Sequence, residues 1–244
     1  MDVFQQLTDD YNRRARLVPA ILVVLPIAIL AVLAVPVLVT LWGKVAALLI
    51  AAGLPFVASQ VVRDRGQRVQ QRLYQDWQGG PAEDLLRWRS AEPRPAVARR
   101  HSLVTKHLGI ELPDAAGEAA QPGEADDAYR TAVTALRERT RDAKMFPLVV
   151  EENIAYGFRR NTYACRIPAI VVCALMALVT LLVAATGLLP LGWKQQAGLV
   201  TFDVVAAAGW ALWCTADAVH RAAQGYGRQL VAALEILDSD RQQA

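Results

Sequence analysis

Asp203 is the residue whose type and position point most directly to chemistry, because it is the one ionisable residue inside a long apolar stretch. An acid in a membrane-spanning helix must find a hydrogen-bond donor or stay protonated, since the burial of a lone charge is costly. Two interpretations stay open: an acid that passes protons or cations, and a protonated acid held by a neighbouring hydroxyl or carbonyl group. Ala207 and Ala211 share its helical face, and small residues allow close packing, so in an oligomer Asp203 could line a shared interior.

The other candidates for catalysis or metal binding lack the spacing that such chemistry needs. His101 and His107 fall on opposite sides of a helix, and no third ligand is near them. The stretch from Gly187 to Lys194 reads GLLPLGWK and lacks the Gly-Lys-Ser/Thr ending of a phosphate-binding loop. The cysteines show no CxxC spacing, and we expect free thiols that pack as small hydrophobic groups; they are Cys165, Cys173 and Cys214. We therefore expect no enzyme, no metal and no cofactor.

A run of arginines forms a basic stripe directly after an apolar stretch. The stripe consists of Arg63, Arg65, Arg68 and Arg72. Beside a membrane, such a stripe suits contact with anionic lipids. Every membrane protein that follows the positive-inside rule carries similar residues, so the stripe indicates no specific function. The formal net charge of +3 gives no ground for nucleic-acid binding.

Long apolar runs must position these residues. Four of them qualify as membrane spans: Leu17–Trp42, Val45–Val62, Ile167–Leu189 and Ala197–Ala216. The first would be about 39 Å long as a helix, which exceeds the ~30 Å of a bilayer core. It is too long for the apolar part of a signal peptide, and a second run follows almost at once. Pro26 and Pro36 lie inside it and predict kinks, either in a bent packing helix or at a gating hinge.

The distribution of Lys and Arg predicts the orientation of the spans. Of the 26 Lys and Arg residues, only Lys44 and Lys194 lie in the two short turns between paired spans. Cytoplasmic segments carry the excess of positive charge. We therefore expect a multi-pass protein of a bacterial inner (cytoplasmic) membrane, with both termini and the long middle segment in the cytoplasm.

The predicted fold class is all-α, an integral membrane protein with two transmembrane hairpins and a small helical cytoplasmic domain between them. The five predicted segments are an N-terminal segment (1–16), hairpin 1 (17–62), the cytoplasmic domain (63–166), hairpin 2 (167–216) and a C-terminal amphipathic helix (217–244).

Turn residues predict the helices of the middle segment. Gly79-Gly80-Pro81 ends a helix that continues from the second span, and Pro81 begins a short one. Further helices are expected from Ala96 to Leu108, from Ala125 to Lys144, and from Pro147 into the third span, with a loop over 109–127. Near the C-terminus, Gly225 and Gly227 are expected to weaken an amphipathic helix over Ala218–Asp238.

Two stretches resemble an uncharacterised family of bacterial proteins with paired transmembrane helices. One is WQGGP at 77–81 followed by Leu85-Leu86-Arg87, and the other is EENIAYGFRRN at 151–161. The resemblance covers roughly residues 60–165 and the topology, and it implies no activity. By architecture alone, membrane hairpins around a small cytoplasmic domain are similar to the membrane effectors of bacterial antiphage systems.

Two hypotheses on function follow. The first is a membrane effector or pore-forming assembly that responds to a cytoplasmic protein or a small-molecule signal. The second is a non-catalytic scaffold that recruits a cytoplasmic partner through residues 80–160. Membrane lipids are expected partners of either, and a second copy of the chain is a further one.

Overall fold

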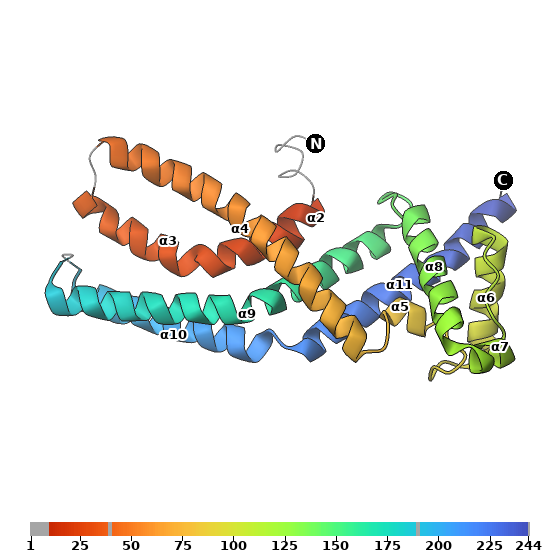
Figure 1. The fold of residues 1–244 in the computed structure, drawn as a ribbon. Coiled ribbons are helices and arrows are strands. Elements are labelled where there is room, and N and C mark those ends of the chain that lie inside the picture. The colour runs from red at the N-terminus through yellow and green to blue at the C-terminus, as the bar shows by residue number, and fades with distance from the viewer. Residues whose placement is uncertain (1–9, 39–40, 189–190, 244) are drawn as a thin grey trace. The chain divides into compact units, whose positions relative to one another are not determined.

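In the computed structural model, helices are the only regular elements among the residues described, so the predicted all-α fold class is confirmed for them (Figure 1). The structure describes the backbone of residues 10–38, 41–188 and 191–243, and the side chains of residues 11–33, 57–188 and 191–238. The elements are α2 (Asp10–Asn12), the π-helix η1 (Arg13–Leu17), α3 (Val18–Leu38), α4 (Leu41–Asp76), α5 (Pro81–Asp84), α6 (Arg94–Leu108), α7 (Ala115–Ala120), α8 (Pro122–Arg139), α9 (Pro147–Thr186), α10 (Trp193–Trp213) and α11 (Ala216–Gln243).

The chain divides into two compact units. The apolar unit comprises residues 1–70 and 157–219, and the polar unit comprises residues 71–156 and 220–244. The polar unit thus combines most of the predicted middle segment, 63–166, with most of the predicted C-terminal segment, 217–244.

Three helices among the described residues are long and apolar enough to cross a membrane: Arg13–Leu33, Pro147–Thr186 and Trp193–Trp213. They support the predicted membrane protein. The predicted second span, Val45–Val62, falls on α4, but the side chains of residues 34–56 lie outside the described residues, so a fourth span stays a prediction. Residues 1–9 of the predicted segment 1–16 also lie outside them.

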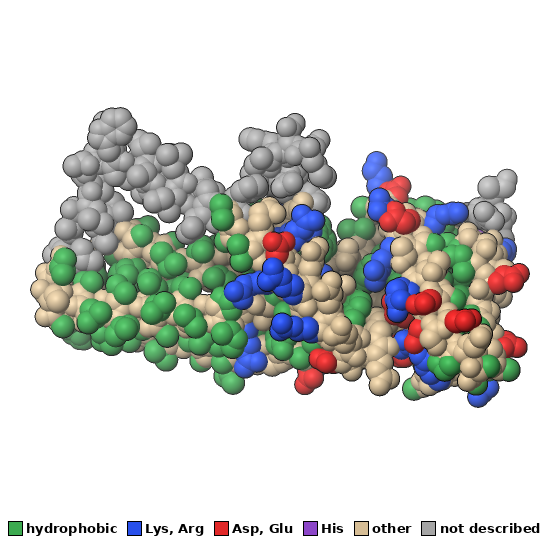
Figure 2. All heavy atoms as spheres, viewed as in Figure 1, with side chains coloured by type: hydrophobic (Ala, Val, Ile, Leu, Met, Phe, Trp, Pro, Cys, Tyr) green, Lys and Arg blue, Asp and Glu red, His purple; other side chains and the backbone are tan. Residues whose placement is uncertain are grey.

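Many of the described apolar side chains of the apolar unit are exposed. Figure 2 shows them gathered over α9 and α10. Examples are Leu181, Leu182, Val204 and Leu212, each more than half exposed. The interior is made largely of small residues, with Ala20, Val62, Ala169 and Cys173 around Trp210. Such an apolar exterior around a thin core is stable in lipid, where van der Waals packing of small residues holds helices together.

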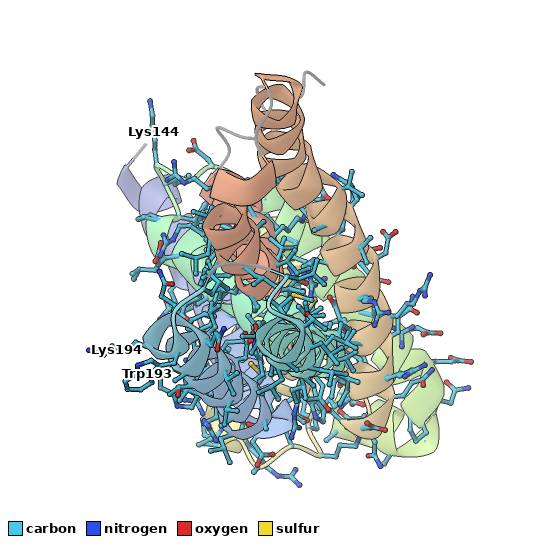
Figure 3. All side chains as sticks on the ribbon, turned by 90° about the vertical axis from the view of Figure 1, so that its left-hand side faces the viewer. Lys144, Trp193 and Lys194 are labelled. Carbon is cyan, nitrogen blue, oxygen red and sulfur yellow. The ribbon has the colours of Figure 1, made fainter. Side chains whose placement is uncertain are left out.

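One end of this unit carries an aromatic residue typical of a membrane surface. Trp193 is 74% exposed, and the ammonium group of Lys194 lies 5.7 Å from the centroid of its ring. Both side chains extend outward from the start of α10 (Figure 3). This is the turn that the sequence places at the outer membrane interface.

The polar unit has a conventional hydrophobic core. Its largest fully buried apolar side chains are Leu86, Val97, Val104, Tyr129, Val133, Leu136, Phe146, Leu230 and Leu234. They come from the segment after α5, from α6 and α8, from the residue before α9 and from α11. The amphipathic α11 therefore completes the core of this unit.

Turn chemistry explains where the helices of the polar unit begin and end. As predicted, α5 begins at Pro81 and α6 ends before Gly109, which adopts a left-handed conformation with φ of 68°. The predicted loop over 109–127 is wrong, because it contains α7 and the start of α8. Asp114 caps α7 by accepting a 2.7 Å hydrogen bond from the Gly117 N–H, and Pro122 begins α8. The helix predicted to reach Lys144 ends at Arg139.

Candidate functional site

The turn that follows α4 is held in one conformation by a buried arginine. Gln78 and Gly79 both have positive φ angles, 57° and 130°. Arg87 is only 4% exposed; its Nη2 donates to the Gln78 carbonyl at 2.6 Å, and its Nε donates to Asp126 at 2.9 Å. A Cβ atom at Gly79 would lie 2.5 Å from Arg87 Nη2, so only glycine fits there. These contacts therefore stabilise the turn, which directly follows Trp77.

Two neighbouring hollows form a groove in the polar unit. The first has a volume of about 390 Å³ and is lined by Trp77, Gly79, Gly80, Pro81, Asp84, Leu85, Ala91, Glu92, His220, Gln224 and Arg228. The second, of about 290 Å³, is lined by Leu85, Ala96, Arg99, Arg100, Leu103, Arg228, Val231, Ala232 and Glu235. Leu85 and Arg228 belong to both hollows, so they stand at the middle of the groove.

One face of α11 forms a wall of this groove. His220, Gln224 and Arg228 recur every four residues, which places them on the same side of the helix. The His220 ring stacks on Trp77 with a centroid distance of 4.5 Å. A Cβ atom at Gly227 would lie 2.9 Å from the Ala82 nitrogen, so glycine lets α11 approach α5 closely. Gly227 therefore allows α11 to pack closely on α5, a role other than the weakening expected from the sequence.

The charged side chains of the groove differ in what they bind. Arg99 makes two hydrogen bonds to Glu235, at 2.9 and 3.1 Å. Arg100 donates to the Leu85 carbonyl and to Glu92, both at 2.8 Å. Arg228 is exposed and forms no hydrogen bond or ion pair with any described residue. Its guanidinium is therefore the cation that remains available to an anionic ligand.

The buried carboxylate of Glu118 holds the segment that leads to Glu92, a residue of the first hollow. Glu118 is 2% exposed and accepts hydrogen bonds from the Trp88 N–H at 2.7 Å, the Arg89 N–H at 3.2 Å and the Tyr129 hydroxyl at 2.6 Å. Burial alone would raise the pKa of Glu118, but these hydrogen bonds and the Arg89 charge outweigh it and lower the pKa. The segment leading to Glu92 is thus tied to α7 and α8.

A second set of contacts docks α11 onto α6. Asp238 accepts hydrogen bonds from Lys106 Nζ at 2.5 Å and from His107 Nε2 at 2.8 Å. These two bonds hold the pKa of Asp238 below its ordinary value. His101, on the same helix, bonds the Leu86 carbonyl, and burial lowers its pKa. Each histidine is therefore engaged in packing, and within the described ranges no three His, Cys, Asp or Glu side chains gather as metal ligands.

The candidate residues from the sequence lie elsewhere. Asp203 is 4% exposed and buried in the apolar unit on α10. The basic stripe lies along α4, and all four of its side chains, Arg63, Arg65, Arg68 and Arg72, are exposed. The structure thus places Asp203 and the stripe on different helices and in different environments.

Sequence reasoning missed the groove. The four-residue spacing of His220, Gln224 and Arg228 is a readable signal, but the opposite wall comes from residues 77–92, far away in the sequence. Comparison of the chain with protein-family models, curated proteins and solved structures finds no match. The resemblance carried by its two motifs therefore stays a prediction.

Proposed function

We propose that the chain is a membrane effector whose polar unit binds a cytoplasmic partner or a small-molecule signal in the groove, and whose membrane helices respond. The observation that carries this proposal is Arg228, an exposed cation between two hollows that pairs with no described residue. A ligand that brings an anionic group to Arg228 and an apolar or aromatic group to Leu85 and Trp77 suits this groove. The proposed role needs no catalysis.

The proposed topology has four spans in two hairpins, with both termini and the polar unit on the cytoplasmic side of a bacterial inner membrane. Three apolar helices support this topology. The distribution of positive charge supports it too, because the two short turns hold only Lys44 and Lys194 of the 26 Lys and Arg residues. Reporter fusions at residue 115 provide the test. We expect cytoplasmic reporter activity there, and an active periplasmic phosphatase at that position would overturn the topology.

A response in the membrane is proposed to pass through helices that belong to both units. α9 is a single helix from Pro147 to Thr186, and it contributes residues to the polar and the apolar unit. A ligand can shift the state of such a helix only if it binds one of two states more tightly. The proposal therefore requires the groove to differ between the two states of the protein, so that the ligand binds one of them more tightly.

Charge reversal of Arg228 tests the proposal. Arg221 is a matched control, because it is an exposed arginine on the same helix that lines neither hollow. We expect expression of the wild-type chain to lower membrane potential or growth under inducing conditions. Arg228→Glu should abolish this effect and Arg221→Glu should preserve it, at equal membrane levels of both variants. Equal effects of the two variants would argue against the groove as the receiving site.

A scaffold remains the second candidate, because one wall of the groove comes from residues 80–160, the range predicted to recruit a partner. In that case, expression leaves membrane potential unchanged. Arg228→Glu then reduces the amount of a cytoplasmic partner that is crosslinked to the chain, whereas Arg221→Glu does not. Deletion of residues 80–160 separates the two candidates further, since only an effector loses an activity in the membrane.

A further inference from the structure

The face of α11 that lines the groove carries three kinds of chemistry in a fixed order. His220 has an aromatic ring, Gln224 an amide and Arg228 a guanidinium group, and all three line the first hollow. Neighbours in this series are four residues apart, so they follow one another at steps of about 6 Å along the helix. The groove therefore offers stacking at one end, hydrogen bonds in the middle and a positive charge at the other end.

The aromatic end of the groove is held by packing within the protein. Tyr74 and His220 both contact the ring of Trp77, with centroid distances of 5.9 and 4.5 Å. Trp77 and His220 both line the first hollow. Aromatic side chains of this kind stack on nucleic-acid bases, because every base has a flat π face. This end of the groove therefore suits a planar ring.

The middle and the charged end of the groove have polar groups that the protein leaves unused. Within the ranges whose side chains are described, neither the Gln224 amide nor the Arg228 guanidinium group makes a hydrogen bond. An amide both donates and accepts, which suits the hydroxyl groups of a sugar. A guanidinium group binds two phosphate oxygens at once.

Two carboxylates also line the first hollow, and each is paired with an arginine. Asp84 lies 3.6 Å from Nη1 of Arg87, and Glu92 accepts a 2.8 Å hydrogen bond from Arg100. These arginines offset the charges of the two acids. Arg228 has no such partner among the described residues, so the groove has a place for one anionic group and not for several.

We propose that the groove binds a nucleotide with a single phosphate, an inference that rests on the proposed function of the groove as a receiving site. A nucleoside monophosphate has a flat base, a hydroxylated sugar and a phosphate, in the same order as the three groups of α11. The base stacks against Trp77 and His220, the sugar hydroxyls bond Gln224, and the phosphate accepts hydrogen bonds from Arg228.

The dimensions of the groove support this class of ligand. The first hollow, of about 390 Å³, is within the usual range of small-molecule sites, about 300–1,000 Å³. Positions 220 and 228 are about 12 Å apart along the helix axis. This separation favours a ligand with a sugar between its ring and its anionic group over a small aromatic acid.

Isothermal titration calorimetry of the full chain in detergent micelles tests the proposal, with the monophosphates of adenosine, guanosine, cytidine and uridine as probes. We expect saturable binding of at least one of them. The site variants are Trp77→Leu and Arg228→Gln. Their matched controls are Trp193→Leu and Arg221→Gln, because Trp193 and Arg221 are exposed and line neither hollow. Each site variant should raise the Kd at least about tenfold, and neither control should.

Two fragments of the nucleotide that binds best assign the ends of the groove. The nucleoside lacks the phosphate, so its Kd should rise in Trp77→Leu and stay unchanged in Arg228→Gln. Ribose phosphate lacks the base and should show the reverse pattern. Because each variant then keeps its affinity for one fragment, a general loss of folding is excluded.

Three results would overturn the proposal. The first is the absence of saturable binding for all the nucleotides tested. The second is inorganic phosphate or indole acetate that binds as tightly as the nucleotide, which would indicate a site for a simple anion or for any aromatic acid. The third is an unchanged Kd in either site variant.

The membrane-potential assay of Arg228→Glu and Arg221→Glu separates a failure of this proposal from a failure of the proposed function. If no nucleotide binds but only Arg228→Glu abolishes the effect in the membrane, the groove receives another ligand and the nucleotide is excluded. If a nucleotide binds as expected but the two variants act alike in the membrane, the nucleotide site is supported and the effector function fails.

Discussion

The side-chain amide of Asn161 donates a 2.6 Å hydrogen bond to the main-chain carbonyl of Ala15. Ala15 lies in the π-helix η1, just before α3. With regular α-helical bonding its carbonyl would accept from the N–H of residue 19, but residue 19 is proline, which has no N–H group. Asn161 is fully buried, so its amide supplies the missing donor inside the apolar unit. Backbone groups near lipid need such replacements, because no water can satisfy them.

We predict that Pro19 and Asn161 are energetically coupled. Asn161→Leu leaves the Ala15 carbonyl without this donor and should lower the free energy of unfolding by about 1–3 kcal/mol. Pro19→Ala restores an N–H at position 19, so the same leucine substitution should cost less in that background. A double-mutant cycle by reversible denaturation in detergent micelles measures the coupling. An equal cost of Asn161→Leu in both backgrounds would show that Asn161 acts otherwise.

A second prediction concerns Gly66, where the absence of a side chain leaves room for Asn161. A Cβ atom at Gly66 would lie only 2.0 Å from Asn161 Oδ1, and the bond to Ala15 prevents that side chain from moving away. Gly66→Ala should therefore destabilise the protein by about 1–3 kcal/mol.

The matched control for Gly66 is Gly209 on α10, where a Cβ atom would meet nothing within 4 Å. Gly209→Ala should leave stability unchanged or raise it by up to about 1 kcal/mol, because alanine favours the helix. Melting temperatures of both variants decide the matter. If the two alanine variants melt alike, the close approach of α4 and α9 at Gly66 is not a constraint.

The sequence was sufficient for features that depend on neighbours in the chain. Apolar runs predicted helices that can cross a membrane, and Pro81 and Gly109 predicted helix ends, because caps and periodicity are local. It was insufficient where the role of a residue depends on another residue far away in the sequence. Pro19 and Asn161 are far apart in sequence, and no local pattern links a missing N–H to a remote amide. Gly227 likewise predicts only a weakened helix in the sequence, whereas in the structure it leaves room for the backbone of Ala82.

The contact between α6 and α11 predicts a loss of stability in acid. Hydrogen bonds from Lys106 and His107 keep the pKa of Asp238 lower in the folded than in the unfolded protein. A carboxyl group of this kind stabilises the fold above its unfolded pKa of about 3.9, and the contribution disappears as pH falls through the folded pKa. We expect the melting temperature to fall below about pH 4 and Asp238→Asn to reduce this dependence.

The acid response of Asp238→Asn needs a control that removes a carboxyl group without removing an interaction. Glu111 is exposed and forms no hydrogen bond or ion pair with a described residue. Glu111→Gln should therefore leave the pH dependence of the melting temperature as in the wild type. Some dependence should persist in Asp238→Asn, because Glu118 and Glu235 also have lowered pKa values. An Asp238→Asn profile identical to the wild type would contradict the prediction.

Asp203 is buried within a single copy of the chain, and this decides what its substitution should do. It is 4% exposed on α10, and no described residue donates a hydrogen bond to it. For a carboxyl group enclosed in this way we expect a role in packing, in preference to the lining of a path between copies. Asp203→Asn, which keeps size and polarity but removes ionisation, should leave melting temperature and membrane potential unchanged.

Two further variants make the test of Asp203 decisive. Asp203→Leu changes shape and polarity inside a packed interior. It should lower the free energy of unfolding by about 1–3 kcal/mol, the usual cost of repacking, and with it expression and melting temperature. Asp217→Asn removes an exposed carboxyl group at the start of α11 and should be silent. Cation or proton flux in proteoliposomes is measured for all three. If Asp203→Asn abolishes flux while the protein still folds and assembles, ionisation of Asp203 matters and the packing role is excluded.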